Sequence, residues 1–339
     1  MQGWQEVFLN FLQTRQGGIV TAEKIIILGA GYTGVELARQ ARERGLSVIC
    51  TTRDKDRRRA LEELGAEVVE WSHGEDLGPW LSRVDESTAV VYSVPTLFRE
   101  VEEGSDGSTE GRPRHVEPVA EVAEAAAAAG AKRFLYLSST SVYGDQGGAW
   151  IDEKTPRVPV SPVGVMRRDI EDFLYNDFGP EWPEIGVTVA RLVGIYGPGR
   201  SLVERLKGGR FRLVDGGRKV TNRIHVEDIG AILLAILAAD PEGVTTYNLS
   251  DGHPQRVRDL VEFVCTELGM PLPPEESLED YAERRNDPNV VARWRTTSRV
   301  RNDRIRTEVG VTLKYPDAFA GYRSILGMSD GSVQALAFR

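Results

Sequence analysis

Short apolar, β-branched runs alternate with longer amphipathic segments over the first three quarters of the chain. Continuous apolar runs are typical of strands buried on both faces, whereas a 3.6-residue period is typical of helices. The apolar runs predict strands at residues 24–28, 46–51, 66–71, 89–94, 133–138, 186–193 and 245–249. The amphipathic segments predict helices at residues 33–44, 54–64, 77–84, 115–129, 167–178 and 226–237. This regular alternation indicates βαβ units, and hence an α/β protein built on a doubly wound parallel sheet.

The pattern changes after Gly252, where helical segments are separated by proline-rich turns. We therefore interpret residues 21–250 as one sheet-containing domain. Residues 251–339 are interpreted as a smaller, mostly helical lobe, to which residues 199–220 also contribute. The helices predicted for this lobe lie at residues 256–268, 276–284, 300–308 and 317–326.

Two further segments have a distinct pattern. Residues 1–20 show helical apolar spacing and predict a short amphipathic helix. We expect this helix to pack on its own domain, and a subunit contact or the remnant of a targeting segment are the alternatives. Residues 102–113 are rich in glycine, serine and glutamate and predict an exposed loop.

The composition limits the classes of partner. The 339 residues are 41% apolar and 27% charged, as in a globular protein, and the net charge of −9 argues against non-specific nucleic-acid binding. Only two cysteines occur, and no apolar run approaches the ~20 residues of a membrane span. We therefore expect a cytoplasmic protein with neither nucleic-acid nor membrane partners. His73, His115 and His253 lack metal-ligand spacing, so no metal site is predicted.

A glycine-rich turn follows the first predicted strand, where residues 29–34 read GAGYTG. In such a turn the first glycine permits the tight bend, the second lets phosphates approach the backbone, and the third lets the helix pack on the strand. The start of the helix adds free N–H groups and a partial positive charge. Because a strand precedes the motif and a helix follows it, we predict a dinucleotide site. Its members are Gly29, Gly31, Tyr32, Thr33 and Gly34.

The end of the second predicted strand discriminates between two dinucleotides. An NAD site usually carries an acidic residue there, which binds the ribose 2′-hydroxyl. Here the strand runs into Thr-Thr-Arg53 without an acid. A guanidinium binds a 2′-phosphate with two N–H groups, so Arg53 favours NADP(H) over NAD(H). Residues 57–59 are also arginines, and we interpret them as the solvated face of a helix.

Three later segments accompany the glycine turn: FLYLSSTSVYG at residues 134–144, ARLVGIYGPG at residues 190–199 and NRIHVED at residues 222–228. Together the four segments resemble the extended short-chain dehydrogenase/reductases, the NAD-dependent epimerase/dehydratase family. The resemblance covers residues 24–327 and implies a Rossmann fold, a nicotinamide dinucleotide and a small-molecule substrate. It also implies cofactor contacts at Ser93, Ser138, Arg167 and Leu192.

The resemblance fails at the catalytic pair. Members of the family use Tyr-x-x-x-Lys, in which the tyrosine is the general acid/base and the lysine lowers its pKa and holds the nicotinamide ribose. In this chain the corresponding residues are Val163 and Arg167, and no tyrosine stands four residues before any lysine. Valine has no proton to give, and positioned acid–base catalysis is typically worth ~100- to 10,000-fold. The chain therefore resembles an atypical branch that keeps the fold without the pair.

Other residues are candidates for the missing chemistry. Ser139 stands where members of the family bind the substrate oxygen. Tyr143 and His225 are candidate proton donors, and a packed aromatic ring and a structural histidine at a helix start are the respective alternatives. Candidate anchors for anionic substrate groups are Arg191, Arg223 and Arg299.

Two functions follow from this pattern. The first is an NADP(H)-dependent oxidoreductase or epimerase that acts on a small polar substrate, such as a sugar nucleotide, with a non-standard proton donor. The second is a catalytically silent NADP(H)-binding sensor or regulatory protein. Ser139 favours the enzyme, and Val163 favours the sensor. Members of the family often form homodimers through helices that flank the sheet, so a homodimer is a further expectation.

Overall fold

The computed structural model describes residues 22–95 and 112–328. The helix predicted within residues 1–20 lies outside these ranges, as does the loop predicted at residues 102–113 except for its last two residues.

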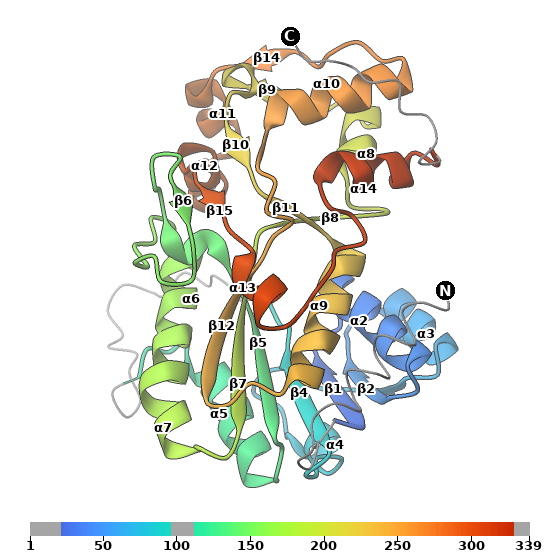
Figure 1. The fold of residues 1–339 in the computed structure, drawn as a ribbon, viewed down its shortest axis with the longest axis vertical. Helices are drawn as coiled ribbons and strands as arrows, with labels where there is room; N and C mark the ends of the chain where they lie inside the picture. Colours follow the sequence, from blue (N-terminus) through green and yellow to red (C-terminus); the bar gives the residue numbers. More distant parts are fainter. Residues whose placement is uncertain (1–21, 96–111, 329–339) are drawn as a thin grey trace.

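Seven parallel strands form one sheet in the order β12-β7-β5-β4-β1-β2-β3 (Figure 1). The chain builds β1, β2 and β3 outwards, then crosses back to add β4 on the other side of β1. This confirms the predicted doubly wound α/β fold. The strands are β1 Lys24–Leu28, β2 Ser47–Thr51, β3 Glu67–Val69, β4 Thr88–Tyr92, β5 Arg133–Ser139, β7 Gly186–Leu192 and β12 Val244–Leu249.

Helices cover both faces of the sheet, and each face has its own apolar core. Ile25 and Ile27 of β1 pack with residues of α2 and α9, whereas Ile26 and Leu28 pack with residues of α5 and α6. Because successive strand side chains point to opposite faces, a strand covered on both sides needs an unbroken apolar run. The helices of this domain are α2 Tyr32–Glu43, α3 Lys55–Glu63, α4 Gly78–Leu81, α5 Glu117–Ala128, α6 Pro162–Phe173, α7 Gly179–Glu181 and α9 Val226–Ala239.

Helix α6 begins at Pro162, five residues before the predicted start at residue 167. Ser161 caps it, because its hydroxyl accepts the Gly164 N–H at 3.1 Å, and proline suits the first helical position. The helix ends in a π-turn at Leu174–Phe178. The predicted range was therefore wrong at its beginning, where cap chemistry rather than apolar periodicity sets the boundary.

A second lobe lies above the sheet in Figure 1 and has a third apolar core, which includes Leu202, Leu260, Val264 and Tyr322. Four pairs of short strands run through it or join it to the sheet domain, and periodicity did not predict them because two or three residues are too few to show alternation. The pairs are β8 Gly194–Tyr196 with β11 Arg223–His225, β9 Leu213–Val214 with β14 Glu275–Glu276, β10 Val220–Thr221 with β13 Gln255–Arg256, and β6 Trp150–Ile151 with β15 Arg299–Val300. The helices of this lobe are α8 Leu202–Lys207, α10 Val257–Leu268, α11 Leu278–Arg285, α12 Pro288–Arg295 and α14 Ala318–Ile325. Helix α13 Asp303–Thr307 instead packs against β12, and its Ile305 belongs to the sheet core that includes α2 and α9.

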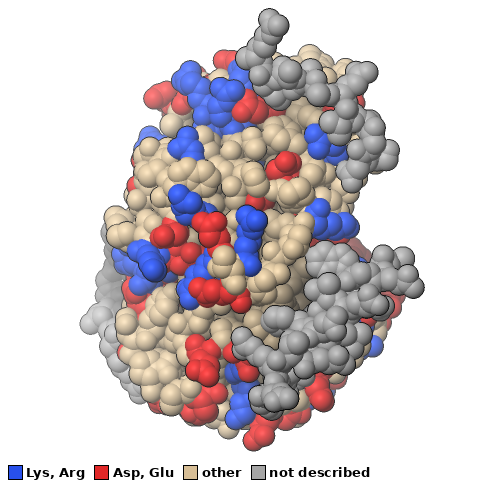
Figure 2. Space-filling model, viewed as in Figure 1, with Lys and Arg blue, Asp and Glu red and all other residues tan. Residues whose placement is uncertain are grey.

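Within residues 22–95 and 112–328, no helix combines the length and the apolar character that a membrane crossing requires. Basic and acidic side chains are interspersed on the face shown in Figure 2, without a large field of one sign.

Candidate functional site

The glycine turn joins β1 to α2 beside the switch point of the sheet, where β4 takes its place next to β1. Gly29 has a φ of +77°, and a Cβ there would lie 2.9 Å from the backbone of Val94. A Cβ at Gly34 would lie 3.1 Å from the side chain of Ile27, so the helix packs closely on the strand. The nearest atom to a Cβ at Gly31 would be the Gly29 carbonyl oxygen, 3.9 Å away. The turn is thus tight at its first glycine, open at its second and closely packed at its third.

The start of α2 fits a bound anion. No side chain among the described residues caps this helix, and its first turn contains no acidic residue. The first N–H groups therefore lack intrahelical partners and carry the positive end of the helix dipole. Thr51 at the end of β2 holds the turn in place, because its hydroxyl accepts the Gly29 N–H at 2.8 Å and its carbonyl accepts the Ala30 N–H at 2.7 Å. These features match what a dinucleotide pyrophosphate requires.

Tyr32 and Thr33 form the first turn of α2. The Tyr32 hydroxyl donates to the Pro198 carbonyl at 2.9 Å, and the guanidinium carbon of Arg200 lies 5.5 Å from the centre of the Tyr32 ring. Burial raises the pKa of Tyr32 to about 12. The side chain of Tyr32 thus links α2 to the second lobe, while the side chain of Thr33 is buried.

Arg53 is an exposed cation just beyond β2. In the part of the chain that the structure describes, Arg53 has neither an ion-pair nor a hydrogen-bond partner. Burial lowers the pKa of the half-buried His73, and the charge of Arg53 lowers it further. Two of the three following arginines are committed to acids: Arg57 to Asp54 at 3.7 Å and Arg58 to Glu70 at 3.0 Å. Arg53 therefore remains available to a ligand.

The other predicted cofactor contacts differ in their surroundings. Ser93 follows β4 and its N–H donates to the Leu28 carbonyl at 2.9 Å, which places it beside the glycine turn. Leu192 ends β7, and its carbonyl accepts the Thr140 hydroxyl at 3.4 Å. Ser138 is buried, and its hydroxyl donates to Glu171 Oε1 at 2.6 Å. The Ser138 side chain is therefore part of the core, which argues against its predicted contact with a cofactor.

Tyr143 and Arg191 lie together in the core. Tyr143 is fully buried, and its hydroxyl donates to Asn248 Oδ1 and accepts from Arg191 Nη1, both at 2.8 Å. Arg191 also pairs with Glu171, with Nη2 and Oε2 2.6 Å apart. Burial raises the pKa of Tyr143 to about 12. These contacts argue against the predicted roles of Tyr143 as a proton donor and Arg191 as a substrate anchor, because neither side chain has a free group facing solvent.

His225 is also a buried structural residue. It stands before α9, where its Nδ1 accepts the Glu227 N–H at 3.3 Å. Its ring centre lies 5.1 Å from that of Tyr196 and 4.0 Å from that of Tyr315. Burial lowers the pKa of His225 to about 4, so the ring is neutral at pH 7. The predicted role in proton transfer near neutral pH is therefore disfavoured.

The two positions of the missing pair lie on α6, with Val163 next to the second lobe and Arg167 next to β5. The Val163 N–H donates to Asn289 Oδ1 of α12 at 3.1 Å, so α12 packs on the start of α6. Arg167 Nη1 donates to the Leu137 carbonyl at 2.9 Å, near the end of β5. Ser139 lies two residues beyond Leu137, on the same face of β5. It is half-buried, and its hydroxyl accepts the Ser141 N–H at 3.2 Å. The Ser139 hydroxyl proton remains available to a substrate oxygen.

A cavity of about 250 Å³ lies in the second lobe, and sequence analysis did not find it. Lys219 lines it, and its ammonium donates to the Thr296 carbonyl. Burial lowers the pKa of Lys219 to about 8, and the charges of Arg293 and Arg223 act in the same direction. The sequence carried no signal for this lysine, because its environment comes from distant segments. The cavity is lined by Val214, Asp215, Arg218, Lys219, Leu278, Trp294, Arg295 and Thr297.

The other two predicted substrate anchors, Arg223 and Arg299, differ in their hydrogen-bond partners. Arg223 lies on β11, and its buried Nε has no hydrogen-bond partner in the ranges described. The guanidinium of Arg299 donates to the Gly148 carbonyl and so holds the loop before β6. Arg223 keeps the character of an anchor for an anion, whereas Arg299 has a structural partner. In residues 22–95 and 112–328, no group of three or more His, Cys, Asp or Glu side chains forms a metal-binding arrangement.

Comparison with known proteins defines the class. A model of the NAD dependent epimerase/dehydratase family matches residues 25–250, and the chain belongs to this family. Protein YeeZ of Escherichia coli K12 is 31% identical over 242 residues, which are 69% of this chain and 80% of that protein. The 3-diazoavenalumate denitrifying reductase of a Streptomyces species is 26% identical over 302 residues, 86% of this chain and 97% of that one.

Solved structures agree with this assignment. A functionally unknown conserved protein from Silicibacter pomeroyi is 32% identical, with a TM-score of 0.73 and coverage of 90% of this chain and 98% of that one. MoeE5 in complex with UDP-glucuronic acid and NAD is 19% identical, with a TM-score of 0.66 and the same coverage, and shares the fold. The protein is thus of the NAD(P)-dependent oxidoreductase and epimerase type in general.

Proposed function

We propose that this protein is an NADP(H)-dependent oxidoreductase or epimerase that acts on a small polar anion. The observation that carries the proposal is the uncapped start of α2 behind Gly31, beside the switch point of the sheet. Open α/β sheets bind their ligands at this point. Arg53 is exposed and has no ion-pair partner among the described residues, which supports NADP(H), because a guanidinium binds a 2′-phosphate through two N–H groups.

The chain's own residues would bind and orient the reactants. A nicotinamide dinucleotide, when bound, supplies hydride transfer. Gly31 and the first N–H groups of α2 bind the pyrophosphate, and Arg53 binds the 2′-phosphate. Arg167, which stands where the family has lysine, holds the nicotinamide ribose. Ser139 donates a hydrogen bond to the substrate oxygen, which orients the reacting carbon.

The proton must come from a source other than the standard tyrosine. Val163 has none to give, and the hydroxyl of Tyr143 and the ring of His225 are enclosed in the core. The substrate itself or a water molecule bound by Ser139 therefore supplies it. Such a reaction is slower than one with a positioned tyrosine, by up to the ~100- to 10,000-fold that acid–base catalysis is worth.

The substrate carries a negative charge. Arg218, Lys219 and Arg295 line the cavity of the second lobe together with one carboxylate, Asp215, and Arg223 acts on Lys219 electrostatically. A sugar nucleotide provides such a charge in its pyrophosphate, and MoeE5, which shares the fold, is described in complex with UDP-sugars. This similarity supports a sugar nucleotide as the first substrate to test.

Cofactor titration tests the proposal directly. Binding of NADPH and NADH to the purified protein is followed by the change in nicotinamide fluorescence. We expect tighter binding of NADPH, and Arg53→Gln should remove the preference while leaving the affinity for NADH unchanged. Arg59→Gln is the matched control on α3. Tighter binding of NADH to the unaltered protein would contradict the assignment of NADP(H).

A second candidate is a silent NADP(H)-binding sensor, which Val163 and the enclosed Tyr143 favour. The two functions differ in single-turnover oxidation of bound NADPH in cell extract. Substrate-dependent oxidation that Ser139→Ala slows supports the enzyme. Tight NADPH binding without any oxidation supports the sensor.

Assembly and location complete the proposal. We infer a homodimer because members of the family often form homodimers. Light scattering of the purified full-length chain measures the mass in solution, and the mass of a monomer would contradict the inference. The low cysteine content supports a cytoplasmic location, which fractionation of cells tests.

A further inference from the structure

Helix α12 of the second lobe completes the start of α6, the helix that carries Val163. The Val163 N–H donates to Asn289 Oδ1 of α12 at 3.1 Å. The N–H of Gly164 donates instead to Ser161 Oγ, also at 3.1 Å but within its own segment. Pro162, the first residue of α6, has no N–H to satisfy. The first turn of α6 therefore depends on one partner from its own segment and one from the second lobe.

The start of α6 is also packed against the segment that carries Ser139. A Cβ at Gly164 would lie 2.8 Å from the Ser141 carbonyl oxygen, so the two backbones are in direct contact. The Ser141 N–H in turn donates to the Ser139 hydroxyl at 3.2 Å. A shift in the first turn of α6 is therefore transmitted to the serine that we assign to the substrate oxygen.

The other end of α12 belongs to the cavity of about 250 Å³ in the second lobe. Trp294 and Arg295 line this cavity, and Trp294 also packs against the apolar core of the lobe. The carbonyl of Thr296, which follows the helix, accepts the Lys219 ammonium. Eight helical residues are about 12 Å long, so α12 spans the distance from this cavity to α6.

Helix α12 is held mainly at its two ends. No side chain of α11 or α12, both of which the structure describes in full, is buried. Asn286, between the two helices, has a φ of +42°, and the Asp287 side chain caps α12 by accepting the Asn289 N–H at 2.9 Å. Segments with few buried contacts have low local stability. A change at one end of α12 is therefore passed to the other end by the helix as a unit.

We propose that Asn289 is a positioning residue that couples the binding of an anion in the second-lobe cavity to the start of α6. An ammonium group has three N–H donors, so Lys219 can hold the Thr296 carbonyl and a bound anion together. An anion held between Lys219 and Arg295 ties α12 to the second lobe and keeps Asn289 on Val163. This inference rests on the proposed function, which assigns the cavity to a negatively charged substrate.

Hydrogen exchange of single backbone N–H groups in the full-length protein, resolved by mass spectrometry, tests the contact. Asn289→Ala should speed exchange of the Val163 N–H about fivefold, the typical effect of one hydrogen bond, and leave that of Gly164 unchanged. Ser161→Ala is the matched control and should speed exchange at Gly164 instead. Asn289→Asp keeps an acceptor oxygen and should restore slow exchange at Val163. Equal acceleration of both N–H groups in Asn289→Ala would indicate only a loosened helix and would overturn the proposal.

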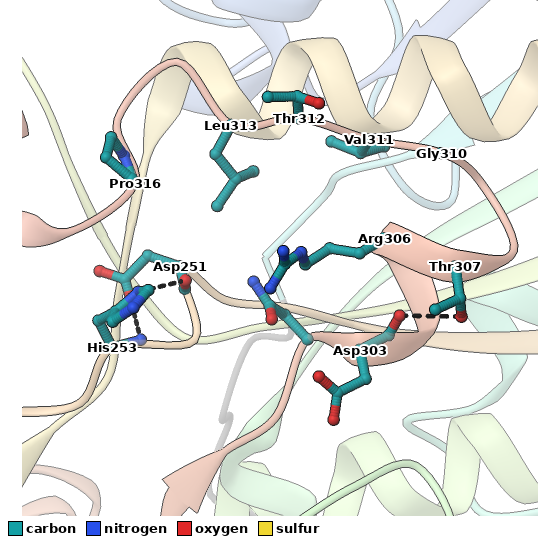
Figure 3. Close-up of a pocket in the computed structure, with 11 residues that line it drawn as sticks. Asp251, His253, Asp303, Arg306, Thr307, Gly310, Val311, Thr312, Leu313 and Pro316 are labelled. Atoms are coloured by element: carbon teal, nitrogen blue, oxygen red, sulfur yellow. Dashed lines mark hydrogen bonds between the residues drawn. The ribbon is translucent and has the colours of Figure 1, made fainter.

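Inorganic pyrophosphate is the probe for the coupling. Its binding, measured by calorimetry, should slow exchange of the Val163 N–H in the unaltered protein but not in Asn289→Ala. Lys219→Gln should weaken this binding about tenfold, because a charged hydrogen-bond donor is lost. Arg306 lines a separate cavity of about 480 Å³ beside α13 (Figure 3), so Arg306→Gln, which also removes one positive charge, should change neither result.

The outcomes separate this inference from the proposed function. Pyrophosphate that binds without slowing exchange at Val163 overturns the coupling and leaves the anionic cavity in place. Equal slowing in the unaltered protein and in Asn289→Ala overturns the role of Asn289. Absence of pyrophosphate binding overturns the coupling and the assignment of an anion to this cavity together.

Discussion

The buried pair of Arg191 and Glu171 allows the sharpest test of the structural reasoning. Both side chains are almost inaccessible, with exposures of 2% and 0%, and Nη2 lies 2.6 Å from Oε2. Glu171→Gln keeps the volume but leaves the Arg191 charge without its counter-ion. It also removes one of the two acidic partners of Arg157, which keeps its pairing with Asp172. Removing one partner of a buried pair costs about 3–5 kcal/mol, because the remaining charge stays desolvated. That is a large part of the ~5–15 kcal/mol by which folded proteins are stable.

Urea unfolding, followed by tryptophan fluorescence and circular dichroism, measures this loss. The control is the double variant Glu171→Leu with Arg191→Met, which removes both charges. It should be less destabilised than the sum of its two single variants, since replacing a whole buried pair with apolar residues is often near neutral. A cost for Glu171→Gln below about 1 kcal/mol, the range of exposed ion pairs, would refute the reasoning.

Three further predictions follow from single residues. Gly29→Ala should cost about 1–3 kcal/mol in urea unfolding and weaken NADPH binding, because the +77° φ is strained for alanine and the Cβ meets Val94; unchanged stability and affinity would contradict this. The stability contribution of Asp251 should fall as pH rises from about 4 to about 8, since the folded state keeps a proton that the unfolded carboxyl, with a pKa of ~3.9, has lost. In urea unfolding across this range, the free energy of unfolding of Asp251→Asn should rise relative to that of the unaltered protein. Parallel pH dependences of the two unfolding free energies would refute the claim. The KM for an anionic substrate should rise above pH 8 as Lys219 loses its proton, and Lys219→Arg, with a pKa above ~12, should flatten the profile; a rise that persists in Lys219→Arg would exclude this lysine as its source.

Some features of the site were accessible from sequence because they depend on neighbours along the chain. Gly29, Gly31 and Gly34 lie within one turn, and each has the geometry that its place in the motif predicted. The position of Arg53 just beyond β2 could be predicted for the same reason, since the residues beside it mark the end of the strand, and its contact with a cofactor stays a prediction. The start of α6 at Pro162 was missed although the signal, Ser161 directly before a proline, stood in the sequence.

The pattern of apolar runs determined the parallel sheet, its two covering layers and the glycine turn, because each arises from local periodicity and backbone freedom. Tertiary structure alone decided whether a polar side chain faces a ligand or the core. The hydroxyl of Tyr143 meets Asn248, 105 positions away, and the ammonium of Lys219 meets the Thr296 carbonyl, 77 positions away. Burial and pairing at such separations set the pKa and the access of a group, and residue type and spacing do not encode them.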